Sequence, residues 1–427
     1  GQGVKVSYWQ RADVPLTDIR WVFNGGSAKD ADLKLGTATL AAEMLTRGAE
    51  GQNGSQFETT LSLAGASLDA SAGVRTTTVH LTTLTESLPL SLKLAVSAMK
   101  APGMLSTEWD SAQRERLAAI EAQSDDPSRV GALVANREYY GGSHPAGRPA
   151  QGTLDTVKKI TLDDVKAQAA AVVNPAGMRI FAAGSLSPTE FQQHLQATLA
   201  GWEPKGSTSP MVALGKPAME DGALKVVLVD RPGASQTVIR LIEPGVNLAS
   251  SDRLALASLG RIMGGSFTSR LNQNLRENKG YTYGAGSSFD FDKEYGTFSV
   301  RTSVRTDVTG ASLTEILKEL KGVAVGNVTT AEAGKSASVG RSDQIEALSS
   351  IEGIVATAAG LYQFDRKLAD LGADLAGSQK VTDADLNKLA PRLGRLDHGV
   401  LVLVGDKSKI LPQLKGLGLP EPVITNP

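Results

Sequence analysis

The sequence predicts an α+β fold made of two repeated domains, each with a mainly antiparallel sheet that has helices packed on one face. Three observations lead to this prediction. The chain has 427 residues, which is more than one hydrophobic core usually serves. Residue patterns recur about 220 positions apart. Strand-like segments alternate apolar and polar residues, which is typical of antiparallel strands, and helix-like segments lie between them.

The internal repeat is visible near the start and near the end of each half. A strand-like segment recurs 220 residues later, and an apolar run that ends in glycine recurs 221 residues later. The matched residues are Ile19 with Ile239, Arg20 with Arg240, Gly25 with Gly245, Asp32 with Asp252, and Gly184 with Gly405. The two halves are therefore predicted to share one structural plan.

The repeat predicts a first domain over residues 1–203 and a second over residues 223–427. The segment between them, 204–222, contains Pro204, Pro210 and Pro217 among scattered Gly, Ser and Lys. It shows neither a helical nor an alternating period, so we expect it to be a linker.

Periodicity predicts the elements of each half in order. The first half begins with a strand over 17–23, a helix over 31–46, a strand over 74–82 and a helix over 86–99. The second half repeats this order with a strand over 236–241, a helix over 251–263, a strand over 297–304 and a helix over 313–320. Before the 297–304 strand, a further helix is predicted to end at Gly280 and to lead into a strand over 281–289.

Composition excludes several classes of function. The chain has 44 basic and 45 acidic residues mixed along its length, so no basic stripe is available for nucleic acid or an anionic membrane. No apolar stretch approaches the ~20 residues of a membrane-spanning helix. The absence of cysteine excludes disulfides and thiolate chemistry. We expect a periplasmic protein, with the cytoplasm as the alternative. A start at Gly1 is consistent with prior removal of a signal peptide or an upstream segment.

The predicted helix over 31–46 is where a zinc peptidase of the inverted type would place His-x-x-Glu-His. That pattern puts two imidazoles on one helix face, with a glutamate beside them to activate water. The chain has Thr39, Ala42 and Glu43 at the three positions. A threonine hydroxyl is a poor zinc ligand and alanine cannot act as a base, so we predict no metal ligands and no cofactor in this chain.

The second half contains a more informative block. Arg276 and Tyr283 lie seven residues apart across the predicted helix-to-strand turn. A guanidinium and a phenol can both donate hydrogen bonds to a peptide carbonyl oxygen, and we predict that this pair assists catalysis. Residues predicted to bind substrate are Gly264, Gly265 and Ser266 in the preceding loop, and Tyr281, which strand alternation places on the side of Tyr283.

Purely structural interpretations of the same residues remain open. Arg276 can form a surface ion pair, the two tyrosines can fill a hydrophobic edge, and Gly264 and Gly265 can end a helix. The histidines are His80, His144, His194 and His398, and no two of them have ligand spacing. No Gly-x-Ser-x-Gly elbow is present.

Both halves resemble the pitrilysin/insulinase family of zinc metallopeptidases, the inverzincins, which includes the mitochondrial processing peptidase and the core subunits of respiratory complex III. In the first half the resemblance rests on Gly36-Thr37-Ala38, Met44 to Gly48, Arg114-Glu115-Arg116, His144-Pro145 and Gly152-Thr153. In the second it rests on Asp230 to Gln236, Gly264-Gly265, Ser269-Arg270-Leu271, Leu275-Arg276-Glu277 and Tyr283-Gly284.

The resemblance implies a chamber built from two half-shells, one carrying zinc and the other lending an arginine and a tyrosine. Carried over to this chain, the lent residues are Arg276 and Tyr283, whereas the metal ligands are not carried over. A third ligand would fall near Glu115 to Glu121. The chain then looks like the metal-free unit of a two-part zinc endopeptidase, inactive alone and acting on peptides.

Two questions about this unit stay open. Its zinc-bearing partner is either a homologous subunit or the upstream half of the same polypeptide. The alternative function is that of a structural or peptide-binding pseudopeptidase, like the respiratory core subunits.

Overall fold

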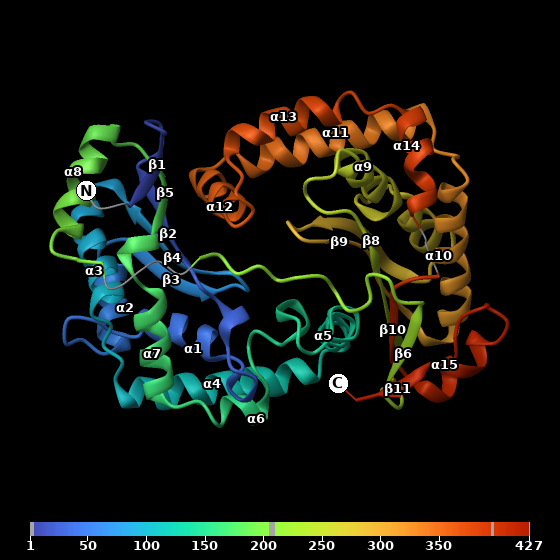
Figure 1. Ribbon diagram of the computed structural model, residues 1–427, viewed down its shortest axis with the longest axis horizontal. Helices are drawn as coiled ribbons and strands as arrows, with labels where there is room; N and C mark the ends of the chain where they lie inside the picture. The colour runs from blue at the N-terminus through green and yellow to red at the C-terminus, as the bar shows by residue number, and fades with distance from the viewer. Residues whose placement is uncertain (1–3, 205–209, 394–396, 427) are drawn as a thin grey trace. The chain divides into compact units, whose positions relative to one another are not determined.

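The computed structural model describes residues 4–204, 210–393 and 397–426. These residues form two compact units, each assembled from three segments of the chain. Unit 1 comprises the described residues within 1–121, 149–213 and 345–368, and unit 2 those within 122–148, 214–344 and 369–427. In Figure 1, unit 1 combines blue and green segments with the orange helix α12, and unit 2 combines the teal helix α5 with yellow to red segments.

Each unit is built on one sheet. In unit 1 the strand order is β1-β5-β2-β4-β3, with bounds Lys5–Gln10, Arg179–Gly184, Leu16–Asn24, Thr76–Leu84 and Ala66–Ala72. In unit 2 the order is β11-β6-β10-β7-β9-β8, with bounds Val423–Thr425, Lys225–Asp230, Val400–Gly405, Gln236–Pro244, Gly296–Arg305 and Thr282–Phe291. The pairs β1 with β5, β6 with β10 and β6 with β11 are parallel, and the other pairs are antiparallel. Both sheets are thus mixed but mainly antiparallel, as predicted.

The two sheets repeat one another strand for strand. Strands β1 to β5 occupy the places that β6, β7, β8, β9 and β10 occupy in unit 2, and β11 is an addition. A matched close approach accompanies this repeat: a Cβ atom at Gly184 would lie 2.7 Å from the hydroxyl oxygen of Thr17, and one at Gly405 would lie 2.9 Å from that of Thr237. Both glycines therefore leave room for the neighbouring strand, which confirms the predicted repeat in three dimensions.

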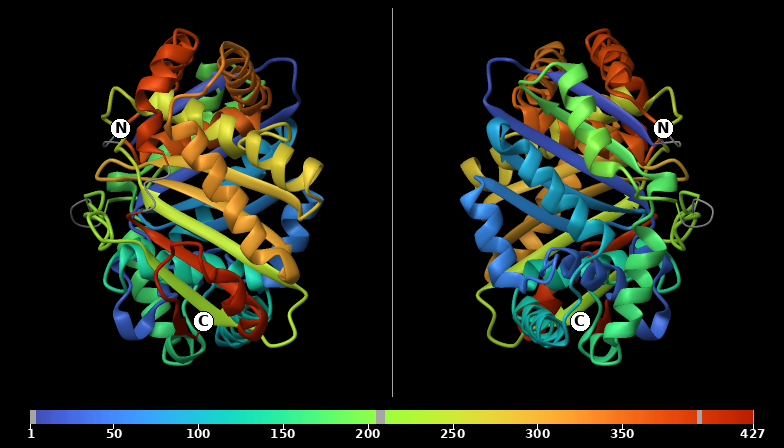
Figure 2. Two further views of the ribbon diagram at one scale, coloured as in Figure 1. Left: turned by 90° about the vertical axis from the view of Figure 1, so that its right-hand side faces the viewer. Right: turned by 90° about the vertical axis from the view of Figure 1, so that its left-hand side faces the viewer.

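One face of each sheet carries the main hydrophobic core. In unit 1, Trp21 and Phe23 of β2 are buried against helices α1 (Thr37–Leu45), α2 (Gly54–Leu63), α3 (Leu88–Lys100), α4 (Ser106–Ser124), α7 (Leu162–Val172) and α8 (Pro188–Leu199). In unit 2, Phe298 and Val300 of β9 are buried against α9 (Arg253–Gly264), α10 (Thr309–Ala324), α14 (Asp383–Leu389) and α15 (Lys407–Leu414). The left view of Figure 2 shows α10, in orange, crossing in front of the strands of unit 2.

The second face of each sheet receives one helix from the other half of the sequence. Val22 and Phe181 of unit 1 pack against Val355 of α12 (Ile351–Tyr362). Val238 of unit 2 packs against Val134 of α5 (Pro127–Tyr140). The compact units therefore exchange helices, whereas the division of the sequence into residues 1–203, 204–222 and 223–427 stays a prediction. The remaining helices are α6 (Leu154–Val157), α11 (Thr330–Ala347) and α13 (Leu368–Ser378).

Some predicted boundaries shift. The helix expected over 31–46 forms only over Thr37–Leu45, because Gly36 has a positive φ of 101° and two 3-10 turns, Ser27–Lys29 and Asp32–Lys34, precede it. The predicted linker lies partly outside the described residues, since 205–209 are not among them, and its described part 210–222 contains neither helix nor strand. No helix in the described parts of the chain combines the length and apolar character needed to cross a membrane.

Candidate functional site

Helix α1 presents Thr39, Ala42 and Glu43, the residues at the predicted metal-motif positions. The buried carboxylate of Asp30 starts this helix by accepting hydrogen bonds from the backbone N–H groups of Gly36 and Ala38, at 2.9 and 3.0 Å. Within the helix, the Thr39 hydroxyl donates to the carbonyl oxygen of Ala150 at 2.7 Å. Ala42 is buried, with 1% of its surface exposed. Neither residue offers a free ligand atom.

Glu43, the third of these residues, forms an ion pair with Arg116 of α4. The Arg116 side chain is only 11% exposed, and burial lowers its pKa from the usual value. Its neighbour Glu115 accepts hydrogen bonds from Arg47, which lower the pKa of that carboxyl group. A guanidinium therefore already neutralises Glu43, and the residues at this position do not fit a zinc ion.

Groups of possible metal ligands are also absent over the rest of the described residues. Within residues 4–204, 210–393 and 397–426, no group of three or more His, Cys, Asp or Glu side chains could hold a metal ion.

The segment that carries Arg276 is a π-helix, η6 (Asn272–Asn278), rather than the predicted α-helix. Leu271 and Leu275 are both fully buried and anchor it in the core of unit 2, as predicted. The segment ends at Asn278, and Gly280, the glycine predicted to end it, follows the C-cap residue Lys279 with a positive φ of 64°. Turns of π-helix are frequent at functional sites. The π-helical geometry of η6 therefore makes its exposed residues candidates for a functional site.

Asn272 joins the three parts of this region. Its amide nitrogen donates to the carbonyl oxygens of Ser266 and Ala285, at 3.0 and 2.8 Å, and its amide oxygen accepts from the N–H of Ala285 at 2.9 Å. The side chain is 7% exposed, so these bonds are well shielded from water. They tie the Gly264 to Phe267 loop, η6 and β8 into one rigid frame.

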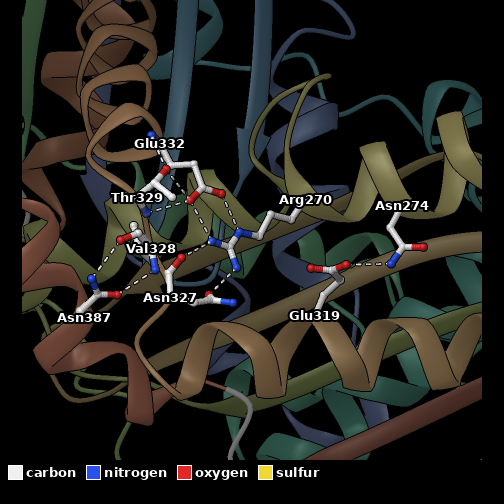
Figure 3. A network of polar contacts seen from close by, with 8 residues as sticks. All are labelled: Arg270, Asn274, Glu319, Asn327, Val328, Thr329, Glu332 and Asn387. Carbon is white, nitrogen blue, oxygen red and sulfur yellow. Dashed lines mark hydrogen bonds and ion pairs between the residues drawn. The ribbon is translucent and has the colours of Figure 1, made fainter.

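Further polar contacts hold η6 and the residues just before it (Figure 3). Arg270 forms a two-pronged ion pair with Glu332 at 2.6 and 2.8 Å and also donates to the side chain of Asn327 at 2.7 Å. The hydrogen bonds from Arg270, together with those from Thr329, lower the pKa of Glu332 to about 2. Asn274 donates to Glu319 at 2.7 Å. Arg270 therefore anchors this region structurally.

A cavity of about 680 Å³ lies within unit 2, formed by β7, β8, β9, η6, the loop after α9 and the first turn of α5. It contains Arg276 and Tyr283 together with Gly264, Gly265 and Ser266, five of the six predicted site residues. Tyr283 is 91% exposed, and the Arg276 guanidinium lies 3.9 Å from the ring centre of Phe267 and 3.4 Å from a carboxylate oxygen of Glu277. The structure thus brings the predicted arginine and tyrosine to one concave surface.

Tyr281 does not line this cavity. Its ring packs against the hydrophobic core of unit 2. The pairing of β8 with β9 shifts between Thr282 and Ala285, and this irregularity breaks the simple alternation that would have placed Tyr281 on the side of Tyr283.

Gly264 and Gly265, two of the four glycines that line the cavity, have a structural requirement of their own. A Cβ atom at Gly264 would lie 2.3 Å from the backbone nitrogen of Ser287, and one at Gly265 would lie 2.6 Å from the Cα of Arg261. No L side chain fits at these separations, so Gly264 is needed for α9 to approach β8, and Gly265 is needed for the chain to turn closely past the last turn of α9. Packing against β8 accounts for Gly264, and the turn at the end of α9 accounts for Gly265, whether or not a ligand also approaches them.

Sequence reasoning missed two cavity residues, Arg240 of β7 and Arg301 of β9. They are directly opposite each other in the antiparallel pairing of these strands. Arg240 was noticeable only as a match to Arg20 in the repeat. Nothing in the linear sequence pairs it with Arg301, because strand register is a property of the folded sheet.

A cavity of about 720 Å³ lies in unit 1, between β1 and α8. Its lining is mostly apolar and includes two ionisable residues, Tyr8 and Glu203. The Tyr8 hydroxyl donates to the carbonyl oxygen of Leu186 at 2.8 Å, and burial, with Glu190, raises its pKa to about 12. This cavity therefore offers little acid–base chemistry at neutral pH.

Comparison with known protein families gives two matches along the chain. Residues 10–142 match the model described as insulinase, peptidase family M16, and residues 159–336 match the model described as peptidase M16 inactive domain. Among individual relatives, an uncharacterized zinc protease of Streptomyces coelicolor is 24% identical over 314 residues, covering 73% of this chain and 68% of the relative. A non-peptidase homolog of Helicobacter pylori is 23% identical over 320 residues, covering 74% and 72%.

Solved structures show the same fold. The crystal structure of a peptidase M16 inactive domain from Pseudomonas fluorescens superposes with a TM-score of 0.85 at 23% identity, over 95% of this chain and 96% of that one. The crystal structure of a protease from Helicobacter pylori also gives a TM-score of 0.85, at 17% identity over 94% and 97% of the two chains.

Proposed function

The chain belongs to the M16 peptidase family of insulinase and pitrilysin, and we propose that within this family it is the unit that holds the peptide and not the unit that binds zinc. One observation carries the proposal: Arg276 and Tyr283 share a cavity of about 680 Å³ in unit 2, while Glu43 of α1 is paired with Arg116. The first feature supports a role for both residues as donors to a peptide carbonyl, and the second supports the lack of a metal site on α1.

The elements that carry Arg276 and Tyr283 determine how the two side chains can act on a peptide. Arg276 projects from η6, which is tied down by buried Leu275 and by the hydrogen bonds of Asn272, and Tyr283 projects from the start of β8. Donors held in place before the peptide arrives need no reorganisation when charge develops on its carbonyl oxygen. We infer that the guanidinium and phenol donate to that oxygen, while a zinc-bearing partner supplies the hydrolytic step.

The partner is proposed to be a homologous subunit or the upstream half of the same polypeptide. Affinity purification of the chain from its native source tests this: we expect to recover a protein or fused segment that contains His-x-x-Glu-His. The recovered pair should hydrolyse an unfolded peptide, and this chain alone should not. Hydrolysis by this chain alone, free of the partner, would contradict the proposal.

A second candidate function is favoured by one comparison. The similarity to the Helicobacter pylori non-peptidase homolog supports a pseudopeptidase that captures peptide or serves as a structural subunit. The two candidates differ in one result. A recovered complex that binds peptide but shows no Arg276-dependent hydrolysis would favour the pseudopeptidase.

A further inference from the structure

The lining of the cavity that contains Arg276 and Tyr283 is rich in positive charge, of which, among the described residues, only Arg276 has a carboxylate partner, Glu277 at 3.4 Å. The described lining includes three arginines, Arg240, Arg276 and Arg301, and no Asp, Glu, Lys or His. Arg240 and Arg301 are directly opposite each other on β7 and β9, and Gly286 is the next residue across on β8. A Cβ atom at Gly286 would lie 3.2 Å from the Nε atom of Arg301, so the absence of a side chain there leaves room for the guanidinium.

The positive charges of Arg240 and Arg301 are poorly neutralised by carboxylates of the chain. Throughout the described residues, neither Arg240 nor Arg301 has a carboxylate oxygen within ion-pair distance, and the Nε of Arg240 is buried without a hydrogen-bond partner. The carboxylate of Asp126 favours the charged form of Arg240, but it is occupied in capping α5 through the N–H of Ser128 at 2.8 Å and in pairing with Arg129.

The other carboxyl group that interacts with Arg301 is that of Asp290. Burial raises the pKa of Asp290, and Arg301 only partly opposes this effect. Like charges directly opposite each other in a sheet destabilise it, and the buried Nε of Arg240, which has no hydrogen-bond partner, adds to the cost, whereas Arg301 is exposed. An anion from outside the chain would relieve both.

We propose that Arg240 and Arg301 form a subsite that binds a carboxylate of the peptide, either an acidic side chain or a free C-terminus. The planar fork of a guanidinium matches the two oxygens of a carboxylate, and two such groups face the same space. The subsite is continuous with Arg276 and Tyr283, so it rests on the proposed function and adds a preference: peptides with a negative charge near the bond that this pair contacts.

Fluorescence anisotropy of labelled peptides with the full chain tests the subsite without any partner. The probes are eight-residue peptides of Ala, Val and Leu with a central Glu or a central Gln, each made with a free and an amidated C-terminus. We expect a peptide carrying one carboxylate to bind about tenfold more tightly than the uncharged peptide, the lower end of what a hydrogen bond to a charged group contributes. Whichever change raises the affinity, the central Glu or the free C-terminus, identifies the source of the carboxylate that the subsite binds.

Arg301→Gln should abolish this advantage, and rising salt should reduce it in the wild type. The matched control is Arg305→Gln, which removes the same charge from the same strand, where Arg305 pairs with Asp307 outside the cavity. A purely structural arginine would lower the melting temperature when replaced. Relief of the repulsion with Arg240 instead predicts that Arg301→Gln melts no lower than Arg305→Gln.

Equal affinity for charged and uncharged peptides would overturn the subsite, as would equal losses in the two variants or the absence of binding to every probe. The failure of the proposed function looks different. If the proposed function is wrong, the chain reconstituted with its partner will hydrolyse the uncharged peptide equally well with and without Arg276. The subsite does not contribute to this assay, because the peptide carries no carboxylate.

Discussion

Glu43 of α1 and Arg116 of α4 form an ion pair inside unit 1, and the arginine side chain is only 11% exposed. A buried guanidinium that loses its carboxylate is left as an uncompensated charge. The pair therefore gives Glu43 a structural function that is independent of any metal, and the first prediction follows from it.

Glu43→Ala should lower the free energy of unfolding by about 2 kcal/mol, because it leaves Arg116 unpaired in a poorly solvated site. Urea denaturation measures this change. Glu115→Ala is the matched control, because Glu115 is 61% exposed and its pair with Arg47 should contribute less than about 1 kcal/mol. Stoichiometric zinc in the wild-type chain, lost in Glu43→Ala, would show instead that Glu43 is a ligand.

Arg276→Ala and Tyr283→Phe should each reduce peptide hydrolysis by the reconstituted pair about 100-fold, since each removes a donor aimed at the carbonyl oxygen. Tyr283→Phe should hardly change assembly or melting temperature, because Tyr283 is 91% exposed, and Arg276→Ala should lower the melting temperature only slightly, through loss of the contact with Phe267. Tyr281→Phe serves as the control, because Tyr281 packs on the core outside the cavity. Equal activity of wild type and both site variants would refute the assignment.

Acid should weaken the anchor between Arg270 and Glu332. The pKa of Glu332 is about 2 in the folded chain against an ordinary value of 4.5, so the folded state binds fewer protons than the unfolded state between these values. The stabilisation is complete above pH 4.5 and is lost as the pH falls toward about 2. Glu332→Gln should thus melt below wild type at pH 7, and the gap should shrink below pH 4.5.

The exposed Glu421 provides the control for this pH dependence, as Glu421→Gln. A gap between Glu332→Gln and wild type that stays constant down to pH 2 would show that Arg270 does not depend on the charge of Glu332.

Gly264→Ala should destabilise unit 2 by at least 2 kcal/mol, because the added methyl group would meet the backbone nitrogen of Ser287 at 2.3 Å. Gly334→Ala, in α11, has nothing within 4 Å of the added atom and should stabilise the chain by about 0.5–1 kcal/mol through helix propensity. Thermal melting compares the two. Similar melting temperatures would mean that α9 and β8 can separate without cost.

A fragment of residues 1–203 should not fold independently. It lacks α12, so Val22 and Phe181 on the second face of its sheet would lose the cover of Val355. We expect strong binding of a hydrophobic dye and aggregation on gel filtration, and recovery when a peptide of residues 345–368 is added. A monodisperse fragment with cooperative melting would show that the sequence halves are independent domains.

Local patterns predicted much of this fold. Alternation over residues 17–23 and 236–241 identified β2 and β7, and the 220-residue offset identified two sheets of one plan. Buried Leu275 and the helix end near Gly280 were also recognised. These features depend on the periods of strand and helix and on the freedom of glycine at positive φ, which neighbouring residues decide.

The candidate site was only partly predictable. The shift in pairing after Thr282 separates Tyr281 from Tyr283, and no local signal marks it. The partner of Glu43 lies 73 residues away on another helix. Both depend on which side chains meet once distant elements pack together.

By itself, the sequence determined the α+β class, the repeated plan, the unsuitability of Thr39 and Ala42 as metal-site residues, and the spacing of Arg276 and Tyr283. Only the tertiary structure decided that Arg240 faces Arg301, that α5 and α12 are exchanged between units, and that Arg276 and Tyr283 share one cavity. Side-chain chemistry and short-range periodicity are properties of neighbouring residues. Strand register, burial and the meeting of charges arise only when the whole chain has packed.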